Sequence, residues 1–347
     1  MPELIKFFDE LSKKDVKIAG GKGASLGEMS GAGISVPPGF AVTAAAFDRF
    51  LHETDLKAEI DALVHELNYK DINRIDQASN TIRDMVHDAR MPKDLQKEIL
   101  EAYQELTTMA RGRTSAAGAT RGPTSMLVAV RSSATAEDSS QASWAGELES
   151  YLNTTEKNLL GNVKKCWSSL FTPRALVYRN EKGMRKSHVS VAVVVQKMVQ
   201  SEIAGVCFTV HPVTKDKHQM IVEAVWGLGE ALVGGLVTPD SYIIDKRDWS
   251  FIDVSVSEQK KMIVRRNSPP ARGGVRGGGS SGSGGGTREI AVPSKLQNRQ
   301  KLDGRQIIEL AKLCAKIETH YKFPCDIEWA LEKDKFYIVQ SRPITTL

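Results

Sequence analysis

The sequence predicts an α+β fold, and three observations carry that prediction. Residues 44–106 place apolar side chains three and four positions apart, as amphipathic helices do. After residue 125 come short runs rich in Val, Ile, Tyr and Thr, which are typical of β-strands. A chain of 347 residues, 41% of them hydrophobic, is long enough for two packed units. We expect one unit over residues 1–187 and the other over 188–347.

The predicted elements follow in chain order. Residues 24–31 follow a glycine cluster and predict a short helix, and the VPPGFAVT segment predicts a turn and a strand before the helices of 44–106. Asp303 and Gln306 form a capping-box pattern at the start of a further helix, and residues 325–342 predict a closing hairpin. The other strands are expected at 126–131, 146–153, 189–199, 203–210, 220–226 and 241–245, interrupted by a helix at about 155–183.

The formal net charge of +5 is concentrated in two low-complexity segments. Residues 107–125 hold three arginines and residues 265–288 hold five, with no acidic residue in either, so the rest of the chain carries −3. Nine of the fourteen residues at 273–286 are glycine. Such segments bury too little apolar surface to offset the entropy of ordering them. We therefore expect a mobile insertion over 107–125 and a disordered insertion over 265–288.

The cysteines and the N-terminus predict a cytoplasmic protein. The four cysteines form no CxxC pair, and scattered thiols suit a reducing compartment better than a disulfide framework. The first fifteen residues lack the apolar core of a signal peptide. No apolar run approaches the ~18 residues of a membrane span. We expect no membrane partner.

A glycine-lysine turn is the first candidate for a phosphate contact. Gly20, Gly21, Lys22 and Gly23 precede the helix predicted at 24–31. Glycines let a backbone approach a phosphate, a helix N-terminus presents free N–H groups, and a lysine adds charge. The spacing is not that of a P-loop, so a plain turn is the alternative.

An arginine with a hydroxyl-rich loop is the second candidate. Arg131 ends an apolar strand and is followed by Ser132, Ser133 and Thr135. A guanidinium can donate two hydrogen bonds to one phosphate, and small polar residues let backbone amides close over it. The alternative is a surface turn in which Arg131 pairs with an acidic residue at 137 or 138.

The closing hairpin predicts a metal and phosphate site by its spacing. Residues 326–331 and 337–342 alternate polar and apolar, as half-buried strands do. A three-residue loop at 333–335 places Glu328 opposite Gln340 and Asp326 opposite Arg342 on one face. Two carboxylates, an amide and a guanidinium there can hold Mg²⁺ and the phosphates that it bridges. The alternative is a solvated face with cross-strand ion pairs. The opposite face is expected to hold Ile327, Trp329, Tyr337 and Val339.

The strand at 189–199 is a candidate for an adenine contact. An adenine can hydrogen-bond to backbone near Gln196 and Met198, where the strand ends, and Glu202 can accept from ribose hydroxyls. A plain core strand is the alternative.

Eight segments together resemble one family, the N-terminal nucleotide-binding domain of phosphoenolpyruvate synthase (pyruvate, water dikinase), with pyruvate phosphate dikinase and rifampicin phosphotransferase as relatives. The likeness runs from about residue 16 to the last residue. It implies an ATP-grasp fold in which two lobes clasp ATP and Mg²⁺. The segments are GGKGASLGEM (20–29), VPPGFAVT (36–43), VRSSATAED (130–138), SWAGELESYLN (143–153), CWSSLFTPRALVYR (166–179), QKMV (196–199), WGLGEALVGGLVTPDSY (226–242) and DIEWAL with FYIVQSRPIT (326–345).

The resemblance implies roles for particular residues. Phosphate contacts, an adenine hinge and a metal pair carry over, and of these residues Lys22, Arg131 and Arg342 are expected to act in catalysis. The phosphate contacts are Lys22, Arg131, the loop from Ser132 to Thr135, and Arg342 beside the γ-phosphate; the hinge is Gln196, Met198 and Val199; the metal pair is Glu328 and Gln340.

The resemblance also implies a phosphotransferase that phosphorylates a histidine on a swivelling domain, which passes the phosphoryl group to pyruvate. That domain and a pyruvate-binding barrel do not appear in this sequence, so we expect the histidine to lie on a partner chain or on a C-terminal half that this sequence lacks. Three positions depart from the family pattern: Cys325 stands where Gln is usual, His211 where Asp is usual, and Glu147 where Gln is usual.

Other functions are alternatives. The acceptor can be that of a rifampicin phosphotransferase or of another dikinase. A protein that binds nucleic acid through its Arg/Gly segments is a second class, but residues 255–320 hold no aromatic side chain for stacking on bases. An ATP sensor without transfer is a third class.

Overall fold

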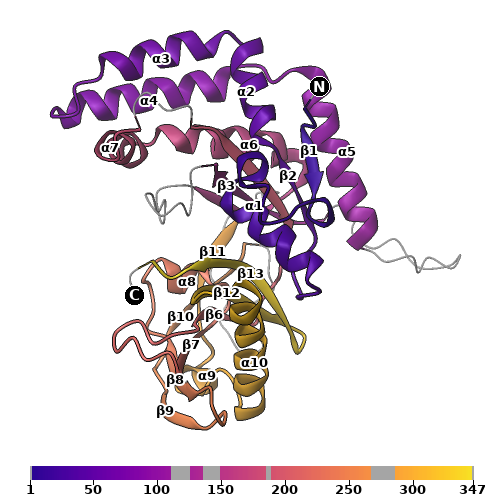
Figure 1. The fold of residues 1–347 in the computed structure, drawn as a ribbon, viewed down its shortest axis with the longest axis vertical. Coiled ribbons are helices and arrows are strands. Elements are labelled where there is room, and N and C mark those ends of the chain that lie inside the picture. Colours follow the sequence, from indigo (N-terminus) through magenta and orange to yellow (C-terminus); the bar gives the residue numbers. More distant parts are fainter. Residues whose placement is uncertain (1, 111–125, 136–148, 185–188, 267–285, 346–347) are drawn as a thin grey trace, which may run out of the picture. The chain divides into compact units, whose positions relative to one another are not determined.

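The structure, a computed structural model, describes residues 2–110, 126–135, 149–184, 189–266 and 286–345. Helices and antiparallel sheets alternate along the chain, which confirms the predicted α+β class (Figure 1). The chain forms two compact units. Unit 1 holds Met1–Gly31 and Pro38–Met198, and unit 2 holds Ala32–Pro37 and Val199–Leu347. The predicted boundary between two functional lobes, at residues 187 and 188, stays a prediction.

Unit 1 is built on a five-stranded antiparallel sheet in the order β1-β2-β5-β3-β4. The central strand β5 is a run of five buried residues, VAVVV, as expected for a strand covered on both faces. Helix α1 packs against β5 and β3, and the other helices bury one large apolar cluster with the sheet. The strands are β1 (Ile5–Phe7), β2 (Gly39–Val42), β3 (Val128–Ala134), β4 (Ser150–Thr154) and β5 (Val191–Lys197).

The helices of unit 1 correct three predictions. The predicted helix at 24–31 begins earlier, at Val16, and the predicted loop at 107–125 begins later, because residues 107–110 continue α5. The predicted helix at 155–183 is interrupted at residues 169–172, since Pro173 opens a new helix that Thr172 caps. The helices are α1 (Val16–Gly31), α2 (Ala44–Glu53), α3 (Leu56–Glu66), α4 (Ile72–Asp88), α5 (Lys93–Ala110), α6 (Glu156–Ser168) and α7 (Pro173–Glu181).

Unit 2 is built on a six-stranded antiparallel sheet in the order β13-β12-β6-β7-β8-β9. Helix α10 begins at the predicted capping box: the Gln306 amide donates to the Asp303 carboxylate at 2.8 Å, and the Asp303 amide donates to the Gln306 side chain at 3.1 Å. The elements are β6 (Ile203–Phe208), β7 (Gln219–Trp226), α8 (Glu230–Val233), β8 (Asp240–Asp245), β9 (Phe251–Ser255), α9 (Ser294–Gln297), α10 (Gly304–Tyr321), β12 (Cys325–Glu332) and β13 (Lys335–Pro343).

The two ends of the arginine-glycine segment pair with each other. Strands β10 (Lys261–Arg265) and β11 (Thr287–Ala291) form a two-stranded antiparallel sheet in unit 2. The predicted insertion at 265–288 is therefore ordered at its borders. Its residues 267–285, and residues 111–125 of the other insertion, lie outside the described residues.

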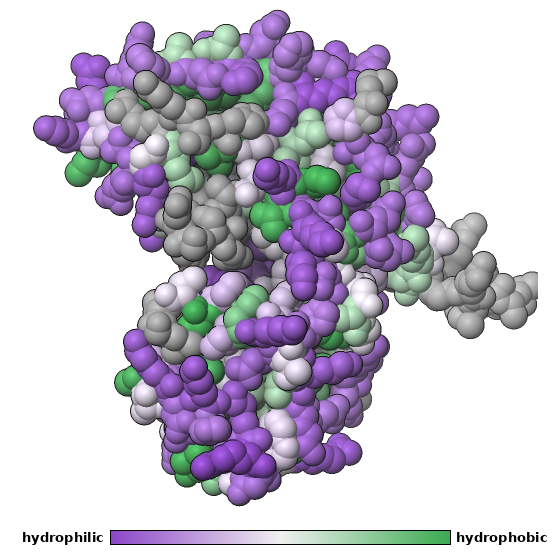
Figure 2. All heavy atoms as spheres, viewed as in Figure 1, coloured by the Kyte–Doolittle hydropathy of each residue, from purple (hydrophilic) through white to green (hydrophobic). Residues whose placement is uncertain are grey.

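On the face that Figure 2 shows, hydrophilic side chains predominate and apolar ones are scattered. Within the described part of the chain, none of the helices combines the length and apolar character needed to cross a bilayer.

Candidate functional site

The predicted glycine-lysine turn is a kink inside α1. Gly20 has φ of +69° and ψ of 175°, so the helix breaks there and resumes at the next residue. A Cβ at Gly20 would lie 2.2 Å from both the carbonyl oxygen and the Oγ of Ser133. Only glycine fits this conformation and this contact. Lys22 therefore stands in the first turn of the resumed helix.

The Ser133 hydroxyl closes this turn. It donates to the Ala19 carbonyl at 2.8 Å and accepts from the amides of Lys22 and Gly23 at 3.1 and 3.3 Å. Ser133 is fully buried. Its hydroxyl is bonded as a helix N-cap is, although it comes from a strand more than a hundred residues away.

Arg131 and the helix that carries Lys22 share one face of the unit 1 sheet. Arg131 pairs with Val194, which pairs with Ala41 on the next strand, and directly paired residues project to the same face. A Cβ on Gly23 would lie 3.6 Å from a methyl group of Val194 and 3.8 Å from the Ala41 Cβ. Helix α1 therefore covers the face to which Arg131 belongs.

Gln196 lies on that same face and Ser132 on the other. Gln196 pairs with Ala129, two residues before Arg131, and is 2% exposed. The Ser132 hydroxyl contacts the Cys166 carbonyl of α6 at 3.2 Å. It also contacts the Ser169 hydroxyl just after α6 and the Glu149 carbonyl, both at 2.9 Å. The two adjacent serines thus bond to helices on opposite faces of the sheet.

Three other predicted site residues, Thr135, Met198 and Glu202, form hydrogen bonds with backbone groups. The Thr135 amide and hydroxyl both donate to the Ser190 carbonyl, at 3.1 and 3.0 Å. The Met198 amide donates to the Leu127 carbonyl at 2.9 Å. In unit 2, the Glu202 amide donates to Leu331 and its carbonyl accepts from Gly227.

The twelve predicted site residues divide between the units. Seven belong to unit 1 and five to unit 2. Unit 1 holds Lys22, Arg131, Ser132, Ser133, Thr135, Gln196 and Met198, and unit 2 holds Val199, Glu202, Glu328, Gln340 and Arg342.

The closing hairpin forms the predicted residue pairs, but its turn and register differ from those predicted. Glu328 pairs with Gln340 and Asp326 with Arg342, as the alternation predicts. The turn, however, has two residues rather than three, Lys333 and Asp334, with φ of 52° and 58°. A β-bulge between Glu328 and Trp329 absorbs the one-residue difference.

The bulge corrects the predicted apolar face. Trp329 pairs with Ile338, and Tyr337 pairs with Ala330. Tyr337 and Val339 therefore leave the Trp329 face and pack with a small cluster on the polar side of the sheet. The cluster consists of Val199, Ala204, Ala330, Tyr337 and Val339.

The pairing across the sheet adds a carboxylate that the sequence analysis missed. Gln340, Glu328, Val206 and Glu223 are paired in turn across β13, β12, β6 and β7. They form one row on one face, which we call the polar row. Because adjacent strands lie about 4.8 Å apart, the Cα atoms of Glu328 and Glu223 are about 10 Å apart. Glu223 lies in the strand that the sequence predicts at 220–226. The two-residue alternation of side chains along that strand was the signal available for finding the face to which Glu223 belongs.

The next row holds an ion pair. Arg342 donates from Nε and from Nη2 to one oxygen of Asp326, at 2.8 and 2.7 Å. Burial raises the pKa of the Asp326 carboxyl, Arg342 opposes that shift, and Glu328 adds to it. Burial also raises the pKa of Glu223, and the charge of Asp326 adds to that shift. The face therefore concentrates negative charge that a cation would stabilise.

The donors of the polar row suit Mg²⁺ bound together with a phosphate. Carboxylate and amide oxygens are ligands that Mg²⁺ accepts, and this ion commonly takes only one or two carboxylates from the protein and the rest from phosphates and water. Among the described residues, no group of three or more His, Cys, Asp or Glu side chains has the geometry of a metal site. The described residues thus offer ligands for a shared ion rather than a complete cage.

Two of the departures from the family pattern have a physical explanation. Cys325 is buried and one residue out of phase with Asp326, so it faces away from the polar row, and burial raises the pKa of its thiol to about 12. The Nδ1 of His211 accepts from the amides of Val213 and Thr214, both at 3.2 Å. Such bonds are those that an Asp side chain makes at a turn. The third departure, Glu147, lies outside the described residues.

Comparison with known proteins identifies relatives. Residues 16–347 match the family model described as "Pyruvate phosphate dikinase, AMP/ATP-binding domain". The chain is 44% identical over 346 residues to the "Probable phosphoenolpyruvate synthase" of Methanocaldococcus jannaschii, which covers 99% of this chain and 27% of that protein. It is 40% identical over 382 residues to the "Phosphoenolpyruvate synthase" of Pyrococcus furiosus, with 99% and 44% covered. The chain thus spans between about a quarter and a half of the length of these relatives.

Proposed function

Because this chain belongs to the family of pyruvate phosphate dikinase AMP/ATP-binding domains, we propose that it binds Mg·ATP and transfers a phosphoryl group to a histidine on a partner domain or chain. The chain is then the nucleotide-binding part of a phosphoenolpyruvate synthase, and pyruvate is converted to phosphoenolpyruvate only through that partner. The names of the relatives support this acceptor over rifampicin or the acceptor of another dikinase.

The observation that carries the proposal is the pairing of Glu328 with Gln340 beside Asp326 and Arg342. In the proposal Glu328 and Gln340 bind Mg²⁺, and Arg342 contacts the γ-phosphate. Asp326 and Glu223 place two further carboxylates on this face, and carboxylate oxygens attract a cation. A cross-strand ion pair alone does not require an amide opposite Glu328.

Unit 1 supplies the other phosphate contacts in this proposal. Lys22 and Arg131 neutralise the phosphate oxygens, and the shared sheet face of Arg131 and α1 supports their joint action. Gln196, Met198 and Val199 line the adenine, and Glu202 accepts from the ribose. The apolar cluster that contains Val199 supports an adenine contact, since a purine ring stacks on apolar and aromatic side chains.

Catalysis then consists of positioning and charge neutralisation. A histidine nitrogen of the partner attacks a phosphorus atom of ATP, the bond from that phosphorus to its bridging oxygen breaks, and the leaving phosphate takes the electron pair. Lys22, Arg131 and Arg342 stabilise the charge that develops on the phosphate oxygens. Bound Mg²⁺ would neutralise further negative charge on the phosphates.

The decisive experiment is titration calorimetry of Mg·ATP with the wild type and with Glu328→Ala. We expect the variant to lose about tenfold or more in affinity, together with the Mg²⁺ dependence of binding. Glu332→Ala is the matched control, because Glu332 ends the same strand next to the turn and pairs with Lys335. Equal affinity and equal metal dependence in wild type and Glu328→Ala would refute the site.

A second experiment addresses the acceptor. A histidine-bearing protein captured with this chain should acquire label from γ- or β-labelled ATP, and the label should be acid-labile and base-stable. ATP binding without transfer to any captured protein would favour the ATP-sensor alternative.

A further inference from the structure

The strand that carries Arg131 also holds the helix that carries Lys22. Arg131 and Ser133 are two residues apart in β3 and so project to the same face of the sheet. The Ser133 hydroxyl bonds to the backbone of α1 on both sides of the kink, at Ala19 and at Lys22 and Gly23. Six covalent bonds of one strand therefore separate the Cα of Arg131 from the Cα of Ser133, at a distance of about 6.6 Å.

The same bonds restrict what the turn can offer to a ligand. A helix N-terminus binds anions through its free N–H groups. Here the amides of Lys22 and Gly23 already donate to a fully buried hydroxyl. A phosphate could accept from these two amides only by displacing the Ser133 hydroxyl. The phosphate contact that we propose for this segment is therefore the Lys22 side chain and not these two amides.

We propose that Ser133 is a positioning residue that sets Lys22 relative to Arg131, and that it does not contact the nucleotide. The inference rests on the proposed function for its effect on ATP binding. A positioning role differs from a direct contact in a measurable way. Because Ser133 acts through Lys22, removing Ser133 should not lower Mg·ATP affinity further in a variant that lacks Lys22.

The neighbouring Ser132 provides a matched control. It is 1% exposed and its hydroxyl is equally well bonded, but to the carbonyls and hydroxyl on the α6 side of the sheet. Ser132→Ala also removes a buried hydroxyl from β3, but one that does not bond to α1. It controls for the general loss of a buried hydroxyl.

The first test measures amide hydrogen exchange by NMR in the nucleotide-free protein. Ser133→Ala should speed exchange at the amides of Lys22 and Gly23 by about fivefold to tenfold, the loss expected for an N-cap. Ser132→Ala should leave both rates unchanged. Unchanged rates in Ser133→Ala would overturn the proposal whether or not the protein binds ATP.

The second test is a double-mutant cycle on Mg·ATP affinity with Ser133→Ala and Lys22→Ala. We expect about a fivefold loss for Ser133→Ala, about tenfold or more for Lys22→Ala, and no further loss in the double variant. Losses that multiply would identify Ser133 as a direct ligand and overturn the proposal.

Two outcomes separate this inference from the proposed function. A wild type that does not bind Mg·ATP would refute the proposed function and the role of Ser133 in binding, while the exchange rates would still decide whether Ser133 holds the turn. Melting curves verify the fold of each variant. If Ser133→Ala fails to fold, Ser133→Cys keeps the shape of the side chain with a somewhat larger atom that accepts hydrogen bonds weakly, so it should shift both measurements in the same direction.

Discussion

Two ion pairs of unit 2 differ in burial: Asp240 with Lys301 is fully buried, and Asp326 with Arg342 is partly exposed. Both side chains of the first pair are 0% exposed, whereas Arg342 is 34% and Asp326 is 11% exposed. The distances are the same, 2.7 Å. The difference therefore lies in what surrounds each pair.

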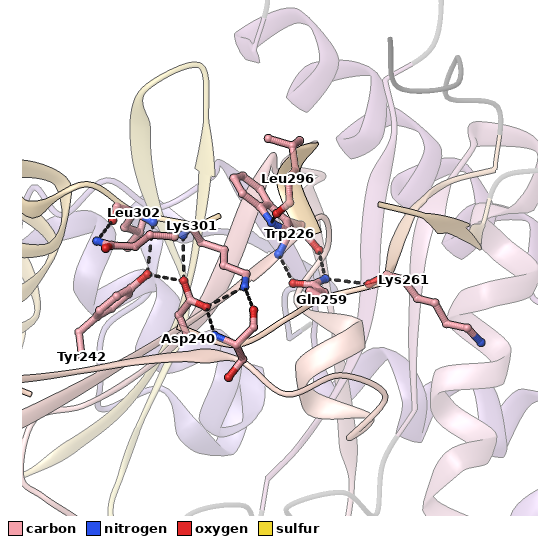
Figure 3. A network of polar contacts seen from close by, with 10 residues as sticks. Trp226, Asp240, Tyr242, Gln259, Lys261, Leu296, Lys301 and Leu302 are labelled. Atoms are coloured by element: carbon pink, nitrogen blue, oxygen red, sulfur yellow. Dashed lines mark hydrogen bonds and ion pairs between the residues drawn. The ribbon is translucent and has the colours of Figure 1, made fainter. Parts of the chain in front are cut away.

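The buried pair belongs to a closed network (Figure 3). Asp240 accepts from the Lys301 ammonium and amide, from the Ser257 amide and from the Tyr242 hydroxyl, at 2.7–2.9 Å. The Lys301 ammonium also donates to the Ser257 carbonyl at 2.6 Å. The bonds of Asp240 to Ser257 and Lys301 tie two segments outside the strand to β8, so this pair organises the fold and offers nothing to a ligand.

The exposed pair lies on the face of the polar row, and a solute can reach it. Burial raises the pKa of Asp326 even though Arg342 opposes the shift. The comparison teaches that a short ion pair alone does not distinguish a structural contact from a functional one. The exposure of the pair does.

The largest expected effect comes from breaking the buried pair with Lys301→Met. An uncompensated buried carboxylate costs about 3–5 kcal/mol, which lowers the melting temperature of unit 2 by roughly 10 °C. Calorimetric melting measures it. Lys261→Met is the control, since Lys261 is 64% exposed beside Glu289 and should shift melting by less than about 2 °C. Equal shifts in the two variants would erase the distinction between the pairs.

Arg342→Met should invert this pattern. Loss of a partly exposed pair costs about 1 kcal/mol or less, so melting changes by only a few degrees. Mg·ATP affinity, in contrast, should fall about tenfold because a phosphate contact is lost. A variant that melts as Lys301→Met does and binds ATP normally would assign Arg342 to the fold instead.

The smallest effect is expected from Glu223→Gln, and it has the opposite sign. Burial and Asp326 raise the pKa of Glu223 in the folded state, so its ionisation costs stability at neutral pH, and that cost disappears as the pH falls toward the ordinary value of 4.5. The variant should therefore melt about 1–2 °C higher at pH 7 and equal to the wild type at pH 4. Melting curves at both pH values decide it, and a gain that persists at pH 4 would contradict the electrostatic cause.

The hairpin shows how far the sequence reached. Alternation predicted the pairs Glu328–Gln340 and Asp326–Arg342, and both are confirmed. The predicted loop was one residue too long, and the bulge at Glu328 compensated for it. Neither Lys333 nor Asp334 is a glycine, so their positive φ values carried no sequence signal. The pairs were right because two local differences cancel.

The serines after Arg131 show what the sequence could not predict. Their types and positions predicted a phosphate loop, yet one hydroxyl bonds to α6 and the other to α1. No local feature of the sequence shows which helix each serine contacts. The partner of Ser132 is more than thirty residues away in sequence, and that of Ser133 is more than a hundred. Glu223 was missed for the same reason, since its row is formed by three other strands.

By itself the sequence determined the α+β class, the order of most elements, the capping box of α10 and the family, because propensity, periodicity and motif spacing are local properties of a chain. Only the tertiary structure decided the bulge, the polar row, the faces of the two serines and the burial that separates Asp240–Lys301 from Asp326–Arg342. Register and burial arise from contacts between segments distant in sequence, and the free energy of those contacts is not a property of either segment alone.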